Sequence, residues 1–171
     1  RINDRLNSAN INRCSVDGLT IPNGGMVGGE ASSYDGDYLT LTSCYVNKCI
    51  LHNGGLVGRF TGSSGGNVIA VACYASDCTL SNGAGGIFGT EVASYGGNAR
   101  AVACYITGCE LGVGAGGIFG RGAANSDWKG GSYAMAVACY AANCNLDIGA
   151  GGIFGEDASI GYAELAGGSA L

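Results

Sequence analysis

A seven-residue sequence, Gly-Ala-Gly-Gly-Ile-Phe-Gly, occurs three times in this chain, at 83–89, 114–120 and 149–155. Each copy ends a longer block with the pattern C-Y-x-x-x-C-x-L-x-x-G-A-G-G-I-F-G, and two shorter blocks begin at Cys14 and Cys44. The first cysteines of successive blocks lie 30, 29, 31 and 35 residues apart. A period of this length is typical of solenoids and propellers, in which each repeat buries its apolar face against its neighbours.

The composition of the blocks favours a solenoid over the other repeat folds. A propeller blade needs four strands in about 40 residues, whereas each block here offers three short β-like segments. Helical periodicity is absent, and the 34 glycines would each cost a helix about 1 kcal/mol. A dinucleotide-binding glycine motif occurs once, between a strand and a helix, and does not explain three copies.

The expected fold is therefore all-β: a right-handed parallel β-solenoid of about five coils with disulfide-stapled corners. The whole chain, 1–171, forms a single domain in this interpretation. Residues 1–13 are expected to form an N-terminal cap or arm, and residues 158–171 a partial coil or tail. The repeats start near residues 14, 44, 73, 104 and 139.

Two motifs resemble a known type of repeat. "GGLVG" at 54–58 becomes "GGIFG" in the later blocks, and "CY" opens each of the last four blocks. These motifs resemble the GLUG-type repeat of large bacterial surface proteins and adhesins, and similar Cys-Tyr variants look like repeats in giant-virus proteins. The resemblance covers about residues 10–157. It implies a β-solenoid with a surface or structural role, and it brings no catalytic residues.

Four blocks contain two cysteines five residues apart. In one straight strand such a pair would lie roughly 16 Å apart, but a corner between them would bring the Cα atoms to the 4.4–6.8 Å that a disulfide requires. We predict one disulfide per coil, and the alternative is a row of free buried thiols. Cys14 has no partner in this scheme and is either buried or bonded to another chain. The predicted disulfides are Cys44–Cys49, Cys73–Cys78, Cys104–Cys109 and Cys139–Cys144.

Strand alternation predicts which side chains face outwards. If the first cysteine of each block points inwards, then Val71, Val102 and Val137 point inwards too, and a flat apolar face lies outside. Either the long segments between coils cover this face or another subunit does, because large exposed apolar patches mark interaction sites. The predicted contact face consists of Tyr45, Ala70, Ala72, Tyr74, Ala101, Ala103, Tyr105, Ala136, Ala138 and Tyr140.

The sequence gives no sign of an enzyme, and we expect no cofactor and no metal. His52 is the one histidine, and a Ser/His/Asp or Cys/His catalytic arrangement cannot be inferred from it alone. The cysteine pairs recur along an axis and do not converge on one zinc ion. Asp35 and Asp37 are candidates for a weak calcium site, although a hydrated loop is the better explanation. Trp128, in the longest insertion, is a candidate loop contact or sugar-stacking platform.

Charge and cysteine content narrow the possible partners and location. A net charge of −5 with eight Lys and Arg residues argues against nucleic acid, and no apolar run approaches the roughly 20 residues of a membrane-inserted helix. Nine cysteines suit an oxidising compartment, so we expect an extracellular, cell-surface or virion-surface protein.

Three functions fit these expectations. The first is a non-enzymatic structural subunit that self-associates into a surface filament, a sheath or a virion coat. The second is an adhesin or glycan-binding module that reads a glycan or cell-surface ligand through its loops at 59–68, 90–100 and 121–135. The third is an ice-binding protein, which flat, rigid solenoids suit, although only "TLT" at 40–42 hints at the usual threonine rows.

Overall fold

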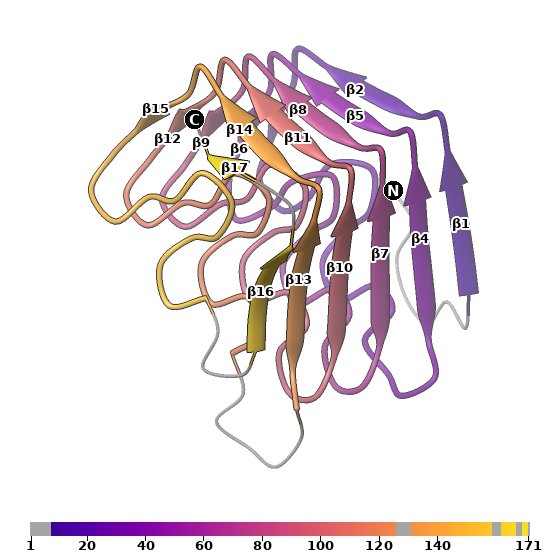
Figure 1. Ribbon diagram of the computed structural model, residues 1–171. Coiled ribbons are helices and arrows are strands. Elements are labelled where there is room, and N and C mark those ends of the chain that lie inside the picture. Colours follow the sequence, from indigo (N-terminus) through magenta and orange to yellow (C-terminus); the bar gives the residue numbers. More distant parts are fainter. Residues whose placement is uncertain (1–7, 126–130, 159–161, 167–168, 171) are drawn as a thin grey trace.

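The chain winds into a parallel β-solenoid, a column in which the strands of successive coils pair side by side (Figure 1). The computed structural model describes residues 8–125, 131–158, 162–166 and 169–170. Three strands follow one another in each coil, and a glycine-rich segment returns the chain to the next coil. The all-β parallel solenoid predicted from the cysteine-to-glycine repeat is thereby confirmed.

Each coil begins with a five-residue strand, and these strands form the first sheet. Its order is β1-β4-β7-β10-β13-β16, with every neighbouring pair parallel. In β4, β7, β10 and β13 the second and fourth residues are buried in the core, as Leu39 and Leu41 are in β4. The strands are β1 (Ser8–Asn12), β4 (Tyr38–Thr42), β7 (Asn67–Val71), β10 (Asn98–Val102), β13 (Tyr133–Val137) and β16 (Tyr162–Ala166).

Two further sheets complete the described strands. The second sheet, in the order β17-β14-β11-β8-β5-β2, contains β2 (Ser15–Asp17), β5 (Tyr45–Asn47), β8 (Tyr74–Ser76), β11 (Tyr105–Thr107), β14 (Tyr140–Ala142) and β17 (Ser169–Ala170). The third, in the order β15-β12-β9-β6-β3, contains β3 (Thr20–Ile21), β6 (Ile50–Leu51), β9 (Thr79–Leu80), β12 (Glu110–Leu111) and β15 (Asn145–Leu146). No helix in the described part of the chain has the length and apolarity to cross a bilayer.

A residue with a left-handed backbone forms each corner between two sheets. Between the first and second sheets φ is 53° at Ser43 and 51° at Ala72, and between the second and third it is 51° at Lys48 and 50° at Asp77. This conformation costs a residue with a Cβ roughly 1–2 kcal/mol. In the second, third and fourth coils the residue after each corner is a cysteine, whose side chain turns into the core.

The fourth side of each coil is built from the glycine-rich segment. Parallel bridges join Val27 to Val57, Val57 to Phe88, Phe88 to Phe119 and Phe119 to Phe154. The last three rings stack, with centroids 4.8 and 5.0 Å apart. Glycine is required beside this row because the backbones pass so closely that a Cβ on Gly116 would overlap the carbonyl oxygen of Phe119.

The corners overturn part of the predicted contact face. Ala70, Ala101 and Ala136 were expected on the outer face, and each is completely buried in the core. Conversely, Val71 and Val102 were expected inside and lie on the outer side of the first sheet, partly exposed. The alternation fails because the left-handed residue before each cysteine shifts the inside–outside phase by one residue.

The rest of the predicted core is largely correct. Beyond the first corner, Val46, Ala75 and Ile106 point inwards as predicted. Leu146 is the exception, because no further strand of the third sheet covers it. The recurring leucines and isoleucines of the blocks were also expected to fill the core, and on the third and fourth sides the following are buried: Leu51, Leu80, Leu111, Ile87, Ile118 and Ile153.

The predicted within-coil disulfides are absent, and all nine cysteines are free. The prediction placed one corner between the two cysteines of a coil. That corner exists, at Lys48 in the second coil, but the three-residue strand β5 also separates Cys44 from Cys49, and each of the two cysteines follows a corner of its own. The structure therefore has two rows of free thiols along the column axis. They replace the predicted bonds Cys44–Cys49, Cys73–Cys78, Cys104–Cys109 and Cys139–Cys144.

Candidate functional site

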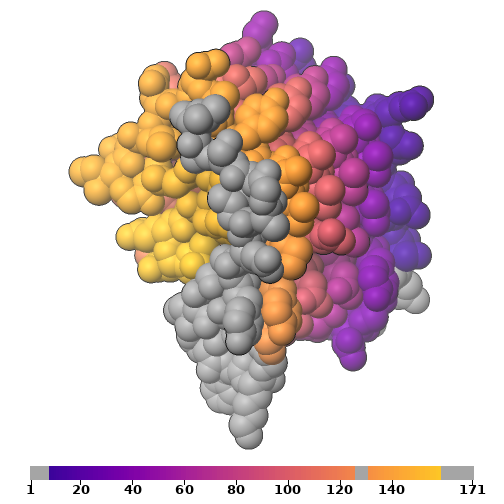
Figure 2. Space-filling view, in the orientation of Figure 1, coloured from indigo at the N-terminus to yellow at the C-terminus, as the bar shows by residue number. Residues whose placement is uncertain are grey.

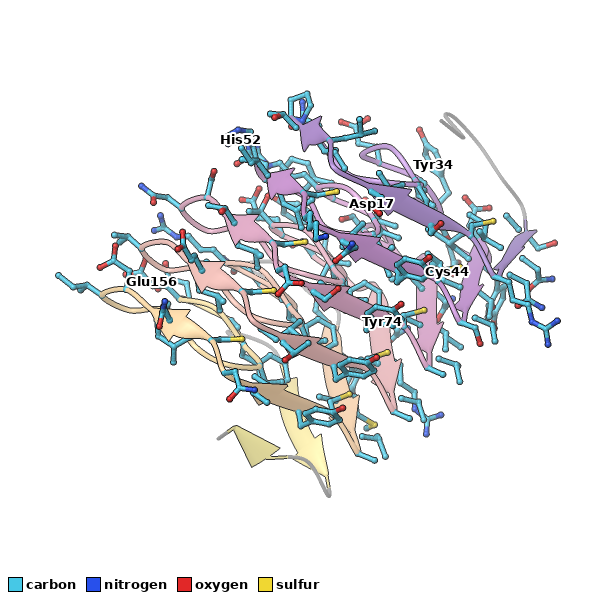
Figure 3. The ribbon with its side chains drawn as sticks, turned by 90° about the horizontal axis from the view of Figure 1, so that it is seen from above. Asp17, Tyr34, Cys44, His52, Tyr74 and Glu156 are labelled. Atoms are coloured by element: carbon cyan, nitrogen blue, oxygen red, sulfur yellow. The ribbon has the colours of Figure 1, made fainter. Side chains whose placement is uncertain are left out.

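A row of tyrosines runs along the outer side of the second sheet. Tyr45, Tyr74, Tyr105 and Tyr140 occupy equivalent positions, and the sheet register places each directly opposite the next. Successive ring centroids lie 4.7, 5.0 and 5.1 Å apart, with interplanar angles of 3° to 6°. Figure 3 shows Tyr74 on this outer surface. The tyrosine part of the predicted contact face therefore lies outside, as expected.

The described loops do not cover this tyrosine row. They connect the glycine-rich side to the start of the first sheet, and they lie away from the second sheet (Figure 1). Beside the row lie the exposed corner alanines Ala72, Ala103 and Ala138. The flat face had two explanations, coverage by the chain's own loops or by another subunit. The described residues do not show the first of these.

The cysteines stack in two rows along the column axis. One row contains Cys14, Cys44, Cys73, Cys104 and Cys139, and the second contains Cys49, Cys78, Cys109 and Cys144. Every described thiol donates to the backbone carbonyl two residues before it, with distances of 3.1 to 3.5 Å. A small, buried side chain with a weak donor thus satisfies the carbonyl that the corner turns inwards.

Burial and neighbouring thiols change the acidity of these rows. Burial raises the pKa of the Cys44 and Cys49 thiols, because their thiolates would lose their hydration. The pKa of Cys104 is also raised, first by hydrogen bonds to Cys139 and Cys73 and then by burial. The same bonds to Cys104 lower the pKa of Cys73 and Cys139. Cys104 therefore holds its proton more tightly than Cys73 and Cys139 do.

Alkaline pH is expected to destabilise the column through Cys44 and Cys49. Because their pKa is raised in the folded protein, the stability that these two thiols contribute is fully present below their unfolded pKa of 9.0. It is lost as the pH rises towards their folded pKa. In that pH window each thiol lowers the free energy of unfolding by up to about 1.4 kcal/mol per pH unit. Urea unfolding in reductant at pH 7 to 11 measures the slope. A Cys44→Ala/Cys49→Ala variant should have a shallower slope, and an identical slope would refute this assignment.

The N-terminal end of the column is open over the described residues. β1, β2 and β3 are the terminal strands of their sheets, and each has a partner on one side only. Two positions of this coil that are buried in the inner coils are correspondingly uncovered. Leu19 is 56% exposed, whereas its equivalent Cys49 is 1% exposed, and Cys14 is exposed as well. Cys14 is thus neither buried nor bonded within the described chain.

The opposite end is also apolar and partly uncovered. β15 is the terminal strand of the third sheet, while β16 and β17 terminate the first and second. Leu146 is 52% exposed, although the equivalent leucines of inner coils are at most 2% exposed. Ile148, two residues later, is 81% exposed. Figure 2 shows the indigo first coil and the orange and yellow last coils at opposite ends of the column.

The remaining candidate residues do not form a catalytic or metal site in the described part of the chain. His52 Nδ1 lies 2.6 Å from the Ser81 hydroxyl of the next coil, which makes it an inter-coil contact. Asp37 is buried and accepts a hydrogen bond from the Tyr34 backbone within its loop. No three His, Cys, Asp or Glu side chains come together as ligands in that part. Trp128 lies outside the described residues.

Comparisons with protein-family models, with curated proteins and with solved structures find no match for this chain. The resemblance to the GLUG-type repeat therefore stays a prediction. Function must be argued from the surfaces themselves: two open ends, a row of tyrosines and the loops.

Proposed function

We propose that this chain is a non-enzymatic structural protein whose copies stack end to end in an extracellular filament, sheath or virion coat. The observation that carries the proposal is the pair of uncovered column ends. An exposed strand edge is a template for pairing with another chain, and most monomeric proteins block such edges with charge, proline or a covering segment. Here the described ends present leucines at core positions.

The two ends are unlike, and that determines the type of assembly they favour. The N-terminal end offers the edges of β1, β2 and β3, and the C-terminal end offers β15, β16 and β17. Contact of unlike surfaces is head-to-tail, which produces open filaments or rings. Strands of the next copy would then continue the three parallel sheets, and Leu19 of one copy would lie near Leu146 of its neighbour.

The finer architecture belongs to the same proposal. The described strands come in five successive triplets followed by β16 and β17, which supports a column of about five coils. Right-handed winding is the rule for parallel crossover connections. A surface or structural role also agrees with the resemblance to GLUG-type repeats. Because the cysteines are free, disulfides no longer support the proposed extracellular location. That location is supported by the resemblance and by the proposed assembly.

Removing the apolar contact at one end should abolish the assembly. We expect the unmodified protein to form linear particles that lengthen with concentration, as measured by sedimentation velocity and negative-stain microscopy. Leu19→Lys should leave monomers, because it places a charge in the proposed contact. Thr79→Lys is the matched control: it adds the same charge to the outward position of β9, on the third sheet of an inner coil, and should assemble normally.

Two outcomes would refute end-to-end stacking. One is a protein that stays monomeric at every concentration, and the other is particles that Leu19→Lys leaves unchanged. Particles lost instead in a Tyr74→Asp/Tyr105→Asp variant would place the contact on the tyrosine row.

Ice binding receives no support from the described surface. Thr40, Ile69, Arg100 and Met135 share one outward position of the first sheet, so the threonine row does not continue beyond its coil. That function remains a prediction without a supporting observation.

A further inference from the structure

A groove of about 600 Å³ lies on the loop side of the column, and its first wall is the loop of the N-terminal coil. Three loops form it, each running from the glycine-rich side to the next five-residue strand. Three aromatic residues line it, Tyr34, Phe60 and Tyr95, together with Glu30 and the hydroxyl residues Ser63 and Ser64. Figure 3 labels Tyr34 near the N-terminal end of the column.

The three loops stack with the same order as the coils. The Glu30 amide donates to the Arg59 carbonyl at 2.9 Å, and the Gly62 amide donates to Ala31 at 3.0 Å. The Ser64 amide donates to the Ser94 carbonyl, also at 3.0 Å. Backbone hydrogen bonds therefore hold the groove walls in place, so its shape does not depend on loose loops.

From the order of the loops we infer a slot between two aromatic residues that line the groove. Tyr34 and Tyr95 come from the outer two loops, and Ser64 belongs to the loop between them. Two coil steps amount to about 9–10 Å. In the tyrosine row of the second sheet the rings lie 4.7 to 5.1 Å apart, so the serine leaves space for one ring. Tyr34 and Tyr95 are 55% and 53% exposed, which makes both accessible from solvent.

A hydroxyl without an acceptor lies in the groove wall. Ser63 is 5% exposed, and its Oγ has no hydrogen-bond partner among the described residues. The cause is local: the Phe60 carbonyl already accepts from the Ser63 amide at 3.3 Å and from the Ser33 hydroxyl at 3.0 Å. Ser94, one coil on, donates instead to the carbonyl three residues before it, at 2.8 Å. Ser63 can therefore change rotamer towards a ligand without losing a hydrogen bond.

The charges around the groove disfavour an anionic ligand. Glu30 contributes a carboxylate to the lining, and the chain has a net charge of −5. Arg59, which precedes the groove residue Phe60, lies over the Phe60 ring at 4.3 Å and forms an ion pair with Glu91. Carboxylates accept strong hydrogen bonds from hydroxyl groups. Aromatic walls with a few fixed polar groups are typical of small-ligand sites.

We propose that this groove binds a pyranose ring of a neutral carbohydrate. The ring lies in the slot between Tyr34 and Tyr95, with its C–H faces against the aromatic rings. Its hydroxyl groups bond to the Glu30 carboxylate and to the Ser63 and Ser64 hydroxyls. The site is lined by loop residues and by none of the terminal strands β1, β2 and β3, so the proposal does not require copies to stack.

Titration calorimetry with neutral trisaccharides tests the proposal. The probes are cellotriose, maltotriose and triacetylchitotriose, with trigalacturonate as the anionic comparison. At least one neutral probe should bind saturably, and trigalacturonate should bind more weakly or not at all. Tyr95→Ala should weaken binding about tenfold, since it removes one stacking contact. Tyr140→Ala is the matched control, because it removes an exposed tyrosine from the second sheet.

Ser63→Ala separates a binding role from a structural one. Since the hydroxyl has no partner in the free protein, its removal should leave the unfolding midpoint unchanged or raise it. The same variant should weaken binding of the neutral probe several-fold. The proposal is overturned if no neutral probe binds, if trigalacturonate binds best, or if Tyr140→Ala weakens binding as much as Tyr95→Ala does.

Discussion

Replacing Gly97 with alanine is expected to lower the free energy of unfolding by about 3 kcal/mol or more. A Cβ at this position would overlap the carbonyl oxygen of Gly62 in the preceding coil. The backbone fixes the position of the Cβ, and the Gly62 oxygen is itself a backbone atom, so neither can move aside by changing a rotamer. Relief requires the two loops to separate, which breaks the register that joins their coils. Urea denaturation measures the loss.

The neighbouring Gly96 is the matched control for this substitution. Its φ is +87°, but a Cβ there would meet no atom within 4 Å. Gly96→Ala should therefore cost only the left-handed backbone penalty of about 1–2 kcal/mol. Equal losses for the two variants would show that backbone strain, and not close approach of the coils, explains the glycine requirement.

Phe119→Ala is expected to destabilise the column by about 3–5 kcal/mol. The Phe119 side chain is completely buried, and its ring stacks between Phe88 and Phe154. The narrow core offers few side chains that could collapse into the cavity. Thermal or chemical unfolding of the purified variant checks the magnitude.

Tyr105→Ala separates burial from ring stacking in this experiment. Tyr105 is also stacked on both sides, at 5.0 and 5.1 Å, but it lies on the outer surface. Its loss should cost about 1–2 kcal/mol, the value of the stacking contacts. If Tyr105→Ala costs as much as Phe119→Ala, stacking dominates and our account of the core is wrong.

The repeat period was sufficient to predict the solenoid, because few folds can place near-identical blocks of about 30 residues in equivalent environments. It was not sufficient to assign the faces. The corners use Ser43, Lys48, Ala72 and Asp77 in left-handed conformations, and alanine and lysine carry no local signal for such a turn. The misplacement of Ala70 follows from the missed corner at Ala72. The disulfide pairing is wrong because a three-residue strand stands between the two cysteines in addition to the predicted corner.

The groove was predictable only in outline. The loops at 59–68 and 90–100 were expected to form a recognition edge, and both contribute to it. Tyr34 was missed because its loop is one residue longer than the others and hides the alignment with Ser64 and Tyr95. The Ser63 hydroxyl is unsatisfied because the hydroxyl of Ser33, thirty positions earlier, donates to the Phe60 carbonyl. No sequence pattern indicates that hydrogen bond.

In-register pairing of successive coils also makes the length of the molecule adjustable. Because like-placed residues meet in inner coils, duplication of one block inserts only contacts that the column already contains. Each added block would lengthen the column by about 4.8 Å and leave both ends chemically unchanged. A gene that gains or loses such blocks by unequal recombination could thus tune the reach of its product in uniform increments while conserving its terminal interfaces.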